Sequence, residues 1–222
     1  METDFWHNRW ENNLTGFHLD DVNPNLQASW SILNLPPKAR VFVPLCGKTL
    51  DMLWLAEQGF QVIGVELSPL AAEAFFSENN LAVQRSQLGE QELWQSENIG
   101  IFCGDFFDLS TNILGQVDAV YDRASLIALP PAMRQNYAAK MLELTARAPK
   151  LLITLEYDQE KMDGPPFSVS QAEVEALYQD YYDVEQYRVQ DVLDENERFR
   201  QKGLGFMNEC IYKLTPKKSA LV

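Results

Sequence analysis

The chain has 222 residues, 46% of them hydrophobic, and this length suits one sizeable core rather than two domains. Its 18 basic and 32 acidic residues give a net charge of −14, which disfavours a nucleic-acid partner because phosphates would be repelled. Three cysteines suit neither a disulfide framework nor a zinc site, and the chain shows no membrane span or secretory signal, so we expect a soluble, cytoplasmic protein without metal or membrane contact.

The first predicted strand covers residues 40–45, where the run RVFVPL follows two prolines and is apolar enough for burial on both faces. A helix is predicted from about 50 to 58, with Gly59 at its end. The second strand, 61–65, stops at Glu66. Ser68 and Pro69 then supply a capping residue and a first-turn proline, which predicts a helix through residue 79.

Further apolar runs predict strands at 99–103, 118–121 and 151–155, with a helix over 131–148 between the last two. A short helix, 170–179, and two more strands, 183–192 and 207–214, follow. Because no long helix separates those two strands, they are expected to pair antiparallel. The pattern therefore predicts an α/β fold with a doubly wound, seven-stranded, mostly parallel sheet and a C-terminal antiparallel hairpin.

Ligands of doubly wound sheets bind beyond the carboxyl ends of the strands, so the residues that follow each strand are candidates for a site. These candidates are residues 45–49, Glu66, Gly104 with Asp105, and Asp122 with Arg123.

The Gly47-Lys48-Thr49 run in the first of these turns is similar to the end of a phosphate-binding loop. That loop needs another glycine five positions before Gly47, where the chain has Phe42. A P-loop nucleotidase would also use Asp122 as its metal-holding acid. Both motifs are incomplete, and a nucleotidase remains the less favoured alternative.

Glu66 lies 19 residues beyond Gly47, at the spacing where dinucleotide sites place an acid on the ribose hydroxyls. The Gly-x-Gly-x-x-Gly fingerprint for a pyrophosphate is missing, so an adenosine cofactor without phosphates fits better than NAD. S-adenosylmethionine is such a cofactor, and an acidic pocket with aromatic faces suits its sulfonium cation. The alternative is that Glu66 is only a solvated strand end.

Large aromatic residues are dense near the N-terminus, at Trp6, Trp10, Phe17 and Trp30. Packing of an entry helix on the core would explain Trp6 and Trp30. For Trp10, which has polar neighbours, and for Phe17, a lid over a small aromatic ligand is at least as good an explanation.

Several segments together resemble the thiopurine S-methyltransferases, above all the bacterial ones, in order and over residues from about 5 to 214. They are WHNRW (6–10), TGFH (15–18), VPLCGK (43–48), GVELS (64–68), DRA (122–124) and DGPPF (163–167). The resemblance implies a seven-stranded, Rossmann-like class I methyltransferase that uses S-adenosylmethionine. It also implies one domain over residues 1–222, with residues 1–35 as a cap on the active site.

The resemblance further implies a role for individual residues. Trp10, Leu45, Gly47, Glu66, Asp105 and Arg123 would bind the cofactor, with Glu66 on the ribose and Asp105 beside the adenine. Phe17, Arg123 and Arg198 would bind the substrate, with Arg200 as the alternative to Arg198.

Methyl transfer to a thiolate is an in-line displacement that needs alignment and desolvation more than acid-base groups. We therefore expect no metal, no obligatory general base and no covalent intermediate, with Arg123 holding the anionic substrate. Cys46 and Cys103 are expected to be buried and inert, and His18 structural. The expected partner is a small aromatic thiol, although selenium or tellurium compounds remain alternatives, as does a non-catalytic interaction protein. A monomer is expected.

Overall fold

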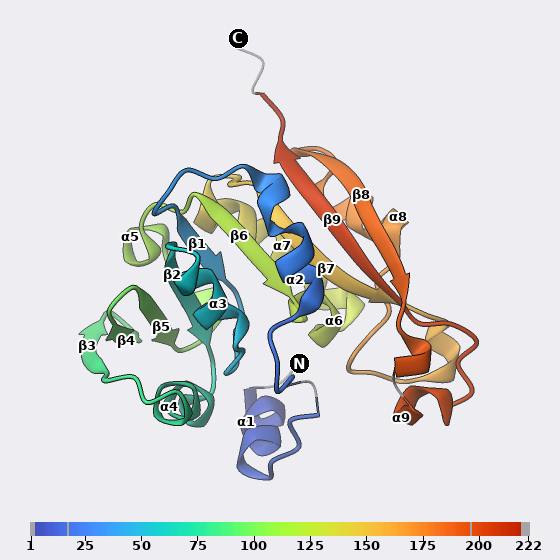
Figure 1. Ribbon diagram of the computed structural model, residues 1–222, viewed down its shortest axis with the longest axis horizontal. Coiled ribbons are helices and arrows are strands. Elements are labelled where there is room, and N and C mark those ends of the chain that lie inside the picture. The colour runs from blue at the N-terminus through green and yellow to red at the C-terminus, as the bar shows by residue number, and fades with distance from the viewer. Residues whose placement is uncertain (1–2, 17, 196, 219–222) are drawn as a thin grey trace.

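Nine strands in the described part of the chain form one sheet in the computed structural model (Figure 1). The structure describes residues 3–16, 18–195 and 197–218. In chain order the strands are β1 (Arg40–Val43), β2 (Gln61–Glu66), β3 (Gln84–Leu88), β4 (Gln91–Ser96), β5 (Ile99–Cys103), β6 (Ala119–Arg123), β7 (Lys150–Glu156), β8 (Tyr182–Asp191) and β9 (Asn208–Pro216). Their spatial order is β3-β4-β5-β2-β1-β6-β7-β9-β8.

The five central strands, from β5 to β7 in the spatial order, are parallel to one another. On one flank β9 pairs antiparallel with both β7 and β8. The predicted doubly wound fold and its C-terminal hairpin are confirmed, and all seven predicted strands are present with ends shifted by no more than two residues.

The hairpin of β3 and β4 on the other flank was not predicted. Every residue of β3 is exposed, so the segment lacks the apolar pattern that marks a strand. It is held by antiparallel pairing with β4 and by the Arg85 guanidinium, which lies 3.4 Å from the centre of the Trp94 ring. The parallel part of the sheet is therefore confined to its centre.

Helices cover both faces of the sheet (Figure 1). The helices of the described residues are α1 (Thr3–Glu11), α2 (Pro24–Ser29), α3 (Asp51–Glu57), α4 (Pro69–Glu78), α5 (Thr111–Leu114), α6 (Ser125–Ala128), α7 (Pro131–Thr145), α8 (Gln171–Tyr178) and α9 (Glu197–Arg200). Buried side chains of α2, α3 and α4 pack in a core on one face, and those of α5 to α8 pack in a core on the other. Within the described ranges, no helix has the length and apolar character needed to cross a bilayer.

The local signals at helix ends act as expected. The Ser68 hydroxyl accepts a hydrogen bond from the Ala71 N–H at 3.4 Å, and Pro69 is the first residue of α4. The helix predicted over 131–148 is shorter, because Ala146 and Arg147 take left-handed φ angles of 46° and 64° that end α7 at Thr145.

Candidate active site

A cavity of about 1060 Å³ opens at the edge of the sheet where the parallel strands end. Its walls come from the N-terminal segment, from the turns after β1, β2, β5 and β6, and from residues near α9. Six residues predicted from the sequence line it: Trp10, Leu45, Gly47, Glu66, Asp105 and Arg123. Phe17 and the side chain of Arg198 lie outside what the structure describes.

The turn after β1 takes an unusual backbone path. Leu45 and Gly47 have left-handed φ angles of 44° and 55°, and the Cys46 N–H donates to the Val65 carbonyl at 3.0 Å. A Cβ on Gly47 would lie 3.3 Å from the Trp10 ring. Glycine is therefore favoured at position 47 both by the backbone angle and by the close approach of Trp10.

Glu66 closes β2 with a buried side chain that is only 6% exposed. One carboxylate oxygen accepts from the Gly47 N–H and the other from the Ser68 N–H, each at 2.8 Å. Burial raises the pKa of Glu66, and the backbone hydrogen bonds from Ser68 and Gly47 oppose that rise. Glu66 is thus no solvated strand end, and it joins the turns after β1 and β2 at the cavity wall.

Asp105 follows β5 and begins a short 3₁₀ turn, Phe106–Asp108. One of its oxygens accepts from the Phe107 N–H at 2.8 Å, and its carbonyl accepts from the Gln91 side chain at 2.9 Å. These bonds fix the Asp105 backbone against β4, so that a carboxylate and two phenylalanine rings face the cavity on the Glu66 side.

Arg123 is the last residue of β6, and Ala124 after it takes a left-handed φ of 67°. The Ser125 hydroxyl donates to the Pro44 carbonyl at 3.1 Å. This bond ties the turn after β6 to the turn after β1, and Arg123 lies at the cavity between them.

Asp122, by contrast, is fully buried, and it is not among the residues that line the cavity. Its carboxylate accepts from the Tyr137 hydroxyl at 2.9 Å and pairs with the Lys150 ammonium at 3.5 Å. An acid in this position has no access to a ligand in the cavity, so the residue that a nucleotidase would use for its metal is engaged in the core.

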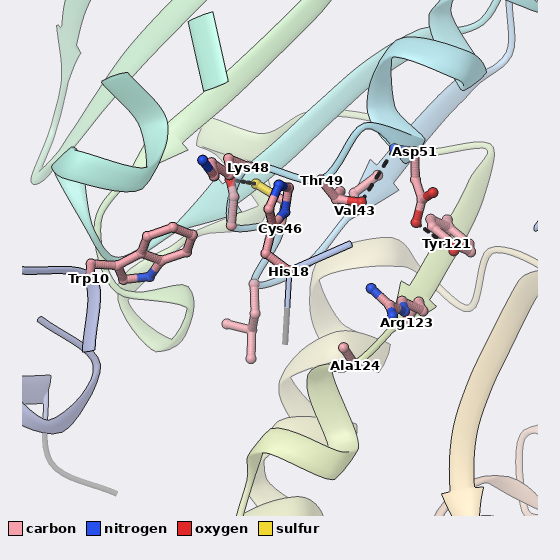
Figure 2. Close-up of a pocket in the computed structure, with 12 residues that line it drawn as sticks. Trp10, His18, Val43, Cys46, Lys48, Thr49, Asp51, Tyr121, Arg123 and Ala124 are labelled. Atoms are coloured by element: carbon pink, nitrogen blue, oxygen red, sulfur yellow. Dashed lines mark hydrogen bonds between the residues drawn. The ribbon is translucent and has the colours of Figure 1, made fainter. Parts of the chain in front are cut away.

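A smaller cavity of about 50 Å³ adjoins the large one beside Arg123 (Figure 2). The Asp51 carboxylate lies there and accepts from the Tyr121 hydroxyl at 2.8 Å. Sequence reasoning missed both residues, because Asp51 has the pattern of an ordinary first helical residue and Tyr121 that of a core strand residue.

His18 lines the same small cavity. Burial lowers its pKa, as does the Lys48 charge, so the imidazole is neutral at pH 7. Cys46 is buried as expected, but Cys103 is only partly buried. Burial raises the pKa of the Cys46 thiol, and partial burial raises that of Cys103 to about 11. Neither thiol is a thiolate at neutral pH, so neither is activated as a nucleophile.

The cavity wall next to α9 is largely apolar, although Lys202 also lines it. Met162, Phe199 and Met207 pack in one buried cluster and line the cavity together with Pro165 and Pro166. The large cavity thus has a polar end at Glu66 and Asp105 and an apolar end at α9, with Arg123 as a cation on its wall.

A doubly wound sheet, a glycine turn after the first strand and an acid that closes the second are the features of a Rossmann-like site for a nucleoside cofactor. Solved methyltransferases share this fold. A methyltransferase from Anabaena variabilis described as SAM-dependent aligns with a TM-score of 0.63 at 15% identity, covering 97% of this chain and 95% of that one. The 1,6-didemethyltoxoflavin-N1-methyltransferase of Burkholderia thailandensis, solved with S-adenosylhomocysteine, aligns with a TM-score of 0.60 at 16% identity, covering 96% and 87%.

The model of the family described as Thiopurine S-methyltransferase (TPMT) matches residues 1–217. The thiopurine S-methyltransferase of Nitrosospira multiformis is 50% identical over 216 residues, which covers 96% of this chain and 98% of that protein. That of Pseudomonas fluorescens is 47% identical over 214 residues, covering 96% and 99%. The chain belongs to the thiopurine S-methyltransferase family. The predicted family, fold class, enzyme class and cofactor, S-adenosylmethionine, are confirmed.

Proposed function

We propose that this methyltransferase acts on the sulfur of thiopurines and related aromatic or heterocyclic thiols. The observation that carries the proposal is the cavity with one polar and one apolar end and Arg123 beside both. The names of the relatives in the family support the same substrate class.

The polar end fits S-adenosylmethionine. The Glu66 carboxylate can accept from ribose hydroxyls, the exposed backbone at Leu45 and Gly47 allows close approach, and Asp105 can accept from the adenine amine. Trp10 presents an aromatic face where it lies against Gly47. When bound, the cofactor supplies a methyl group on a sulfonium, which is an electrophile for a soft nucleophile.

The chain itself would bind and orient the thiol. Arg123 carries a fixed positive charge at any physiological pH and would hold the substrate as its anion. Met162, Phe199 and Met207 would pack on the aromatic ring and exclude water, which an in-line displacement requires. No side chain need take a proton if the thiol arrives as a thiolate.

Phe17 and Arg198 stay in the proposal as substrate-binding residues predicted from the sequence. Arg200, the alternative to Arg198, is half-exposed and lies 3.6 Å from Glu197 and 4.0 Å from Asp194. Because its guanidinium is engaged at the surface, we favour Arg198.

We also propose that the chain is one domain in which residues 1–35 cap the active site, and that it works as a cytoplasmic monomer without nucleic acid. The N-terminal segment supplies cavity-lining residues, among them Trp6, Trp10 and Leu14, which supports the cap. The net charge of −14 supports a partner other than nucleic acid, and the cysteines Cys46, Cys103 and Cys210 are free thiols, as in a reducing compartment.

The test is a substrate panel. We expect 6-mercaptopurine and thiophenol to be methylated on sulfur by the purified protein with S-adenosylmethionine, with the products identified by mass spectrometry. Selenite and tellurite belong in the panel as competing substrates. If S-adenosylhomocysteine binds by calorimetry while no thiol is methylated, the substrate class is wrong and the cofactor site stands.

Glu66→Ala should weaken the binding of S-adenosylhomocysteine, and unchanged affinity would remove Glu66 from the site.

A further inference from the structure

Two carboxylates, one buried and one partly buried, hold the beginning of α2. The Asp51 carboxylate, at the start of α3, accepts from the Asn23 backbone N–H at 2.7 Å. The Glu209 carboxylate, near the start of β9, accepts from the Asn25 side-chain amide. We call Asp51, Glu209, Asn23 and Asn25 the clamp. It attaches the N-terminal segment to elements far away in the sequence.

Three of the four clamp residues are withdrawn from water, whereas Glu209 is partly buried and lines the large cavity. Asp51, Asn23 and Asn25 are 1%, 2% and 3% exposed. The second Asp51 oxygen accepts from the Tyr121 hydroxyl, whose pKa is raised by burial and by the Asp51 charge, so that it remains a donor (Figure 2). Hydrogen bonds to a buried carboxylate are strong, and a donor left without its acceptor is costly.

The residues before the clamp carry Trp10, which packs on Gly47 in the turn after β1. The packing of Trp10 thus holds one end of this segment, and the clamp holds the other. A tether raises the effective concentration of the group that it carries, and it does so only while its own anchor is fixed. Loosening the clamp should therefore weaken the docking of Trp10 as well.

We propose that Asp51 is a positioning residue of this methyltransferase: together with Glu209 it clamps the start of α2 and so places Trp10 over the Gly47 turn. Its effect passes through the Asn23 N–H, from which its carboxylate accepts a hydrogen bond. The inference rests on the proposed cap, and it adds the residue that sets the position of that cap.

Trypsin can report the docking of Trp10. Arg9 is the only lysine or arginine before Lys38, so cutting after Arg9 is a single event in this segment. The Arg9–Trp10 bond should be protected while Trp10, 9% exposed, stays docked, and cleavage measures how often the segment opens. Cleavage after Lys217, which is exposed and far in sequence from Asp51 and Asp118, is the internal reference.

The test variant is Asp51→Asn, which keeps the shape but replaces one acceptor oxygen by an NH₂ group. Either Asn23 or Tyr121 then loses its acceptor. We expect cleavage after Arg9 to be about tenfold faster, and KM for S-adenosylmethionine to rise about tenfold while kcat changes less. Asn25→Ser breaks the other half of the clamp and should act in the same direction, which keeps the test available if Asp51→Asn does not fold.

The matched control is Asp118→Asn. The Asp118 carboxylate also accepts a hydrogen bond from a backbone N–H, that of Arg40 at 2.8 Å. This bond lies at the start of β1, at the end of the sheet opposite the cavity. This variant should leave cleavage after Arg9 within twofold of wild type. The proposal is wrong if the Asp51 and Asn25 variants cleave like wild type, or if Asp118→Asn opens the segment equally. Cleavage is measured without cofactor or thiol, so this result is independent of whether the chain methylates thiols.

Discussion

Gly47→Ala separates the two reasons for a glycine in the turn after β1. At a φ of 55°, a residue with a Cβ costs about 1–2 kcal/mol more than glycine. The new methyl group would also lie 3.3 Å from the Trp10 ring, so the ring must move by a few tenths of an ångström. We expect the free energy of unfolding to fall by about 1–2 kcal/mol and the affinity for S-adenosylhomocysteine to fall as well, because Trp10 and the turn both line the cavity.

Gly59→Ala is the matched control, because Gly59 has a φ of 89° and a Cβ there would meet no atom within 4 Å. Both variants should lose similar stability in urea unfolding, whereas only Gly47→Ala should weaken binding in calorimetry. If Gly47→Ala binds S-adenosylhomocysteine as tightly as wild type, the close approach of Trp10 has no part in the site. If both variants weaken binding, a general loss of stability accounts for the effect.

Three further predictions concern charged groups. Lys150→Met leaves the fully buried Asp122 carboxylate without its cation and should lower the free energy of unfolding by about 3–5 kcal/mol. The double variant Lys150→Met with Asp122→Leu should recover most of that loss, and urea unfolding that shows no recovery would contradict this account. Burial and the Lys48 charge hold the folded pKa of His18 below its ordinary 6.5, so the stability from neutral His18 is complete above pH 6.5 and is lost as the pH falls through the lowered pKa. Wild type should therefore lose more stability than His18→Gln between about pH 7.5 and about pH 5.5 in urea titrations, and equal losses would refute the assignment. Arg123→Ala should lower kcat/KM for 6-mercaptopurine at least about tenfold, and an intact rate would exclude Arg123 as the residue that holds the thiolate.

The sequence was a good guide wherever burial acts on a continuous segment. The central strands are buried on both faces, so their apolar runs predicted the strand ends to within two residues. Ser68 with Pro69 predicted the start of α4. The hairpin of β3 and β4 escaped because its stabilising contact joins Arg85 to Trp94 across two polar strands. A contact between two side chains on different strands leaves no periodic pattern of apolar residues in the sequence.

The same distinction holds for the site. Leu45, Glu66, Asp105 and Arg123 could be predicted, because a doubly wound fold brings the residues after its parallel strands to one edge. The contacts of Asp51 could not, because they join it to Asn23 and Tyr121, which are 28 and 70 residues away. Only the packing of α2 against α3 and β6 brings these residues together.

The position of the site follows from the order of the strands. From β1 the chain passes to β2 on one side, and it later returns to place β6 on the other side of β1. The connections therefore leave β1 and β6 in opposite directions and open a crevice beyond their carboxyl ends. Leu45 lies in the turn after β1, and Arg123 is the last residue of β6. The hydrogen bond from the Ser125 hydroxyl to the Pro44 carbonyl fixes the distance between the two turns. Because the two cores lie on the faces of the sheet and the crevice at its edge, we expect that side chains such as Arg123 can be exchanged at little cost to the fold.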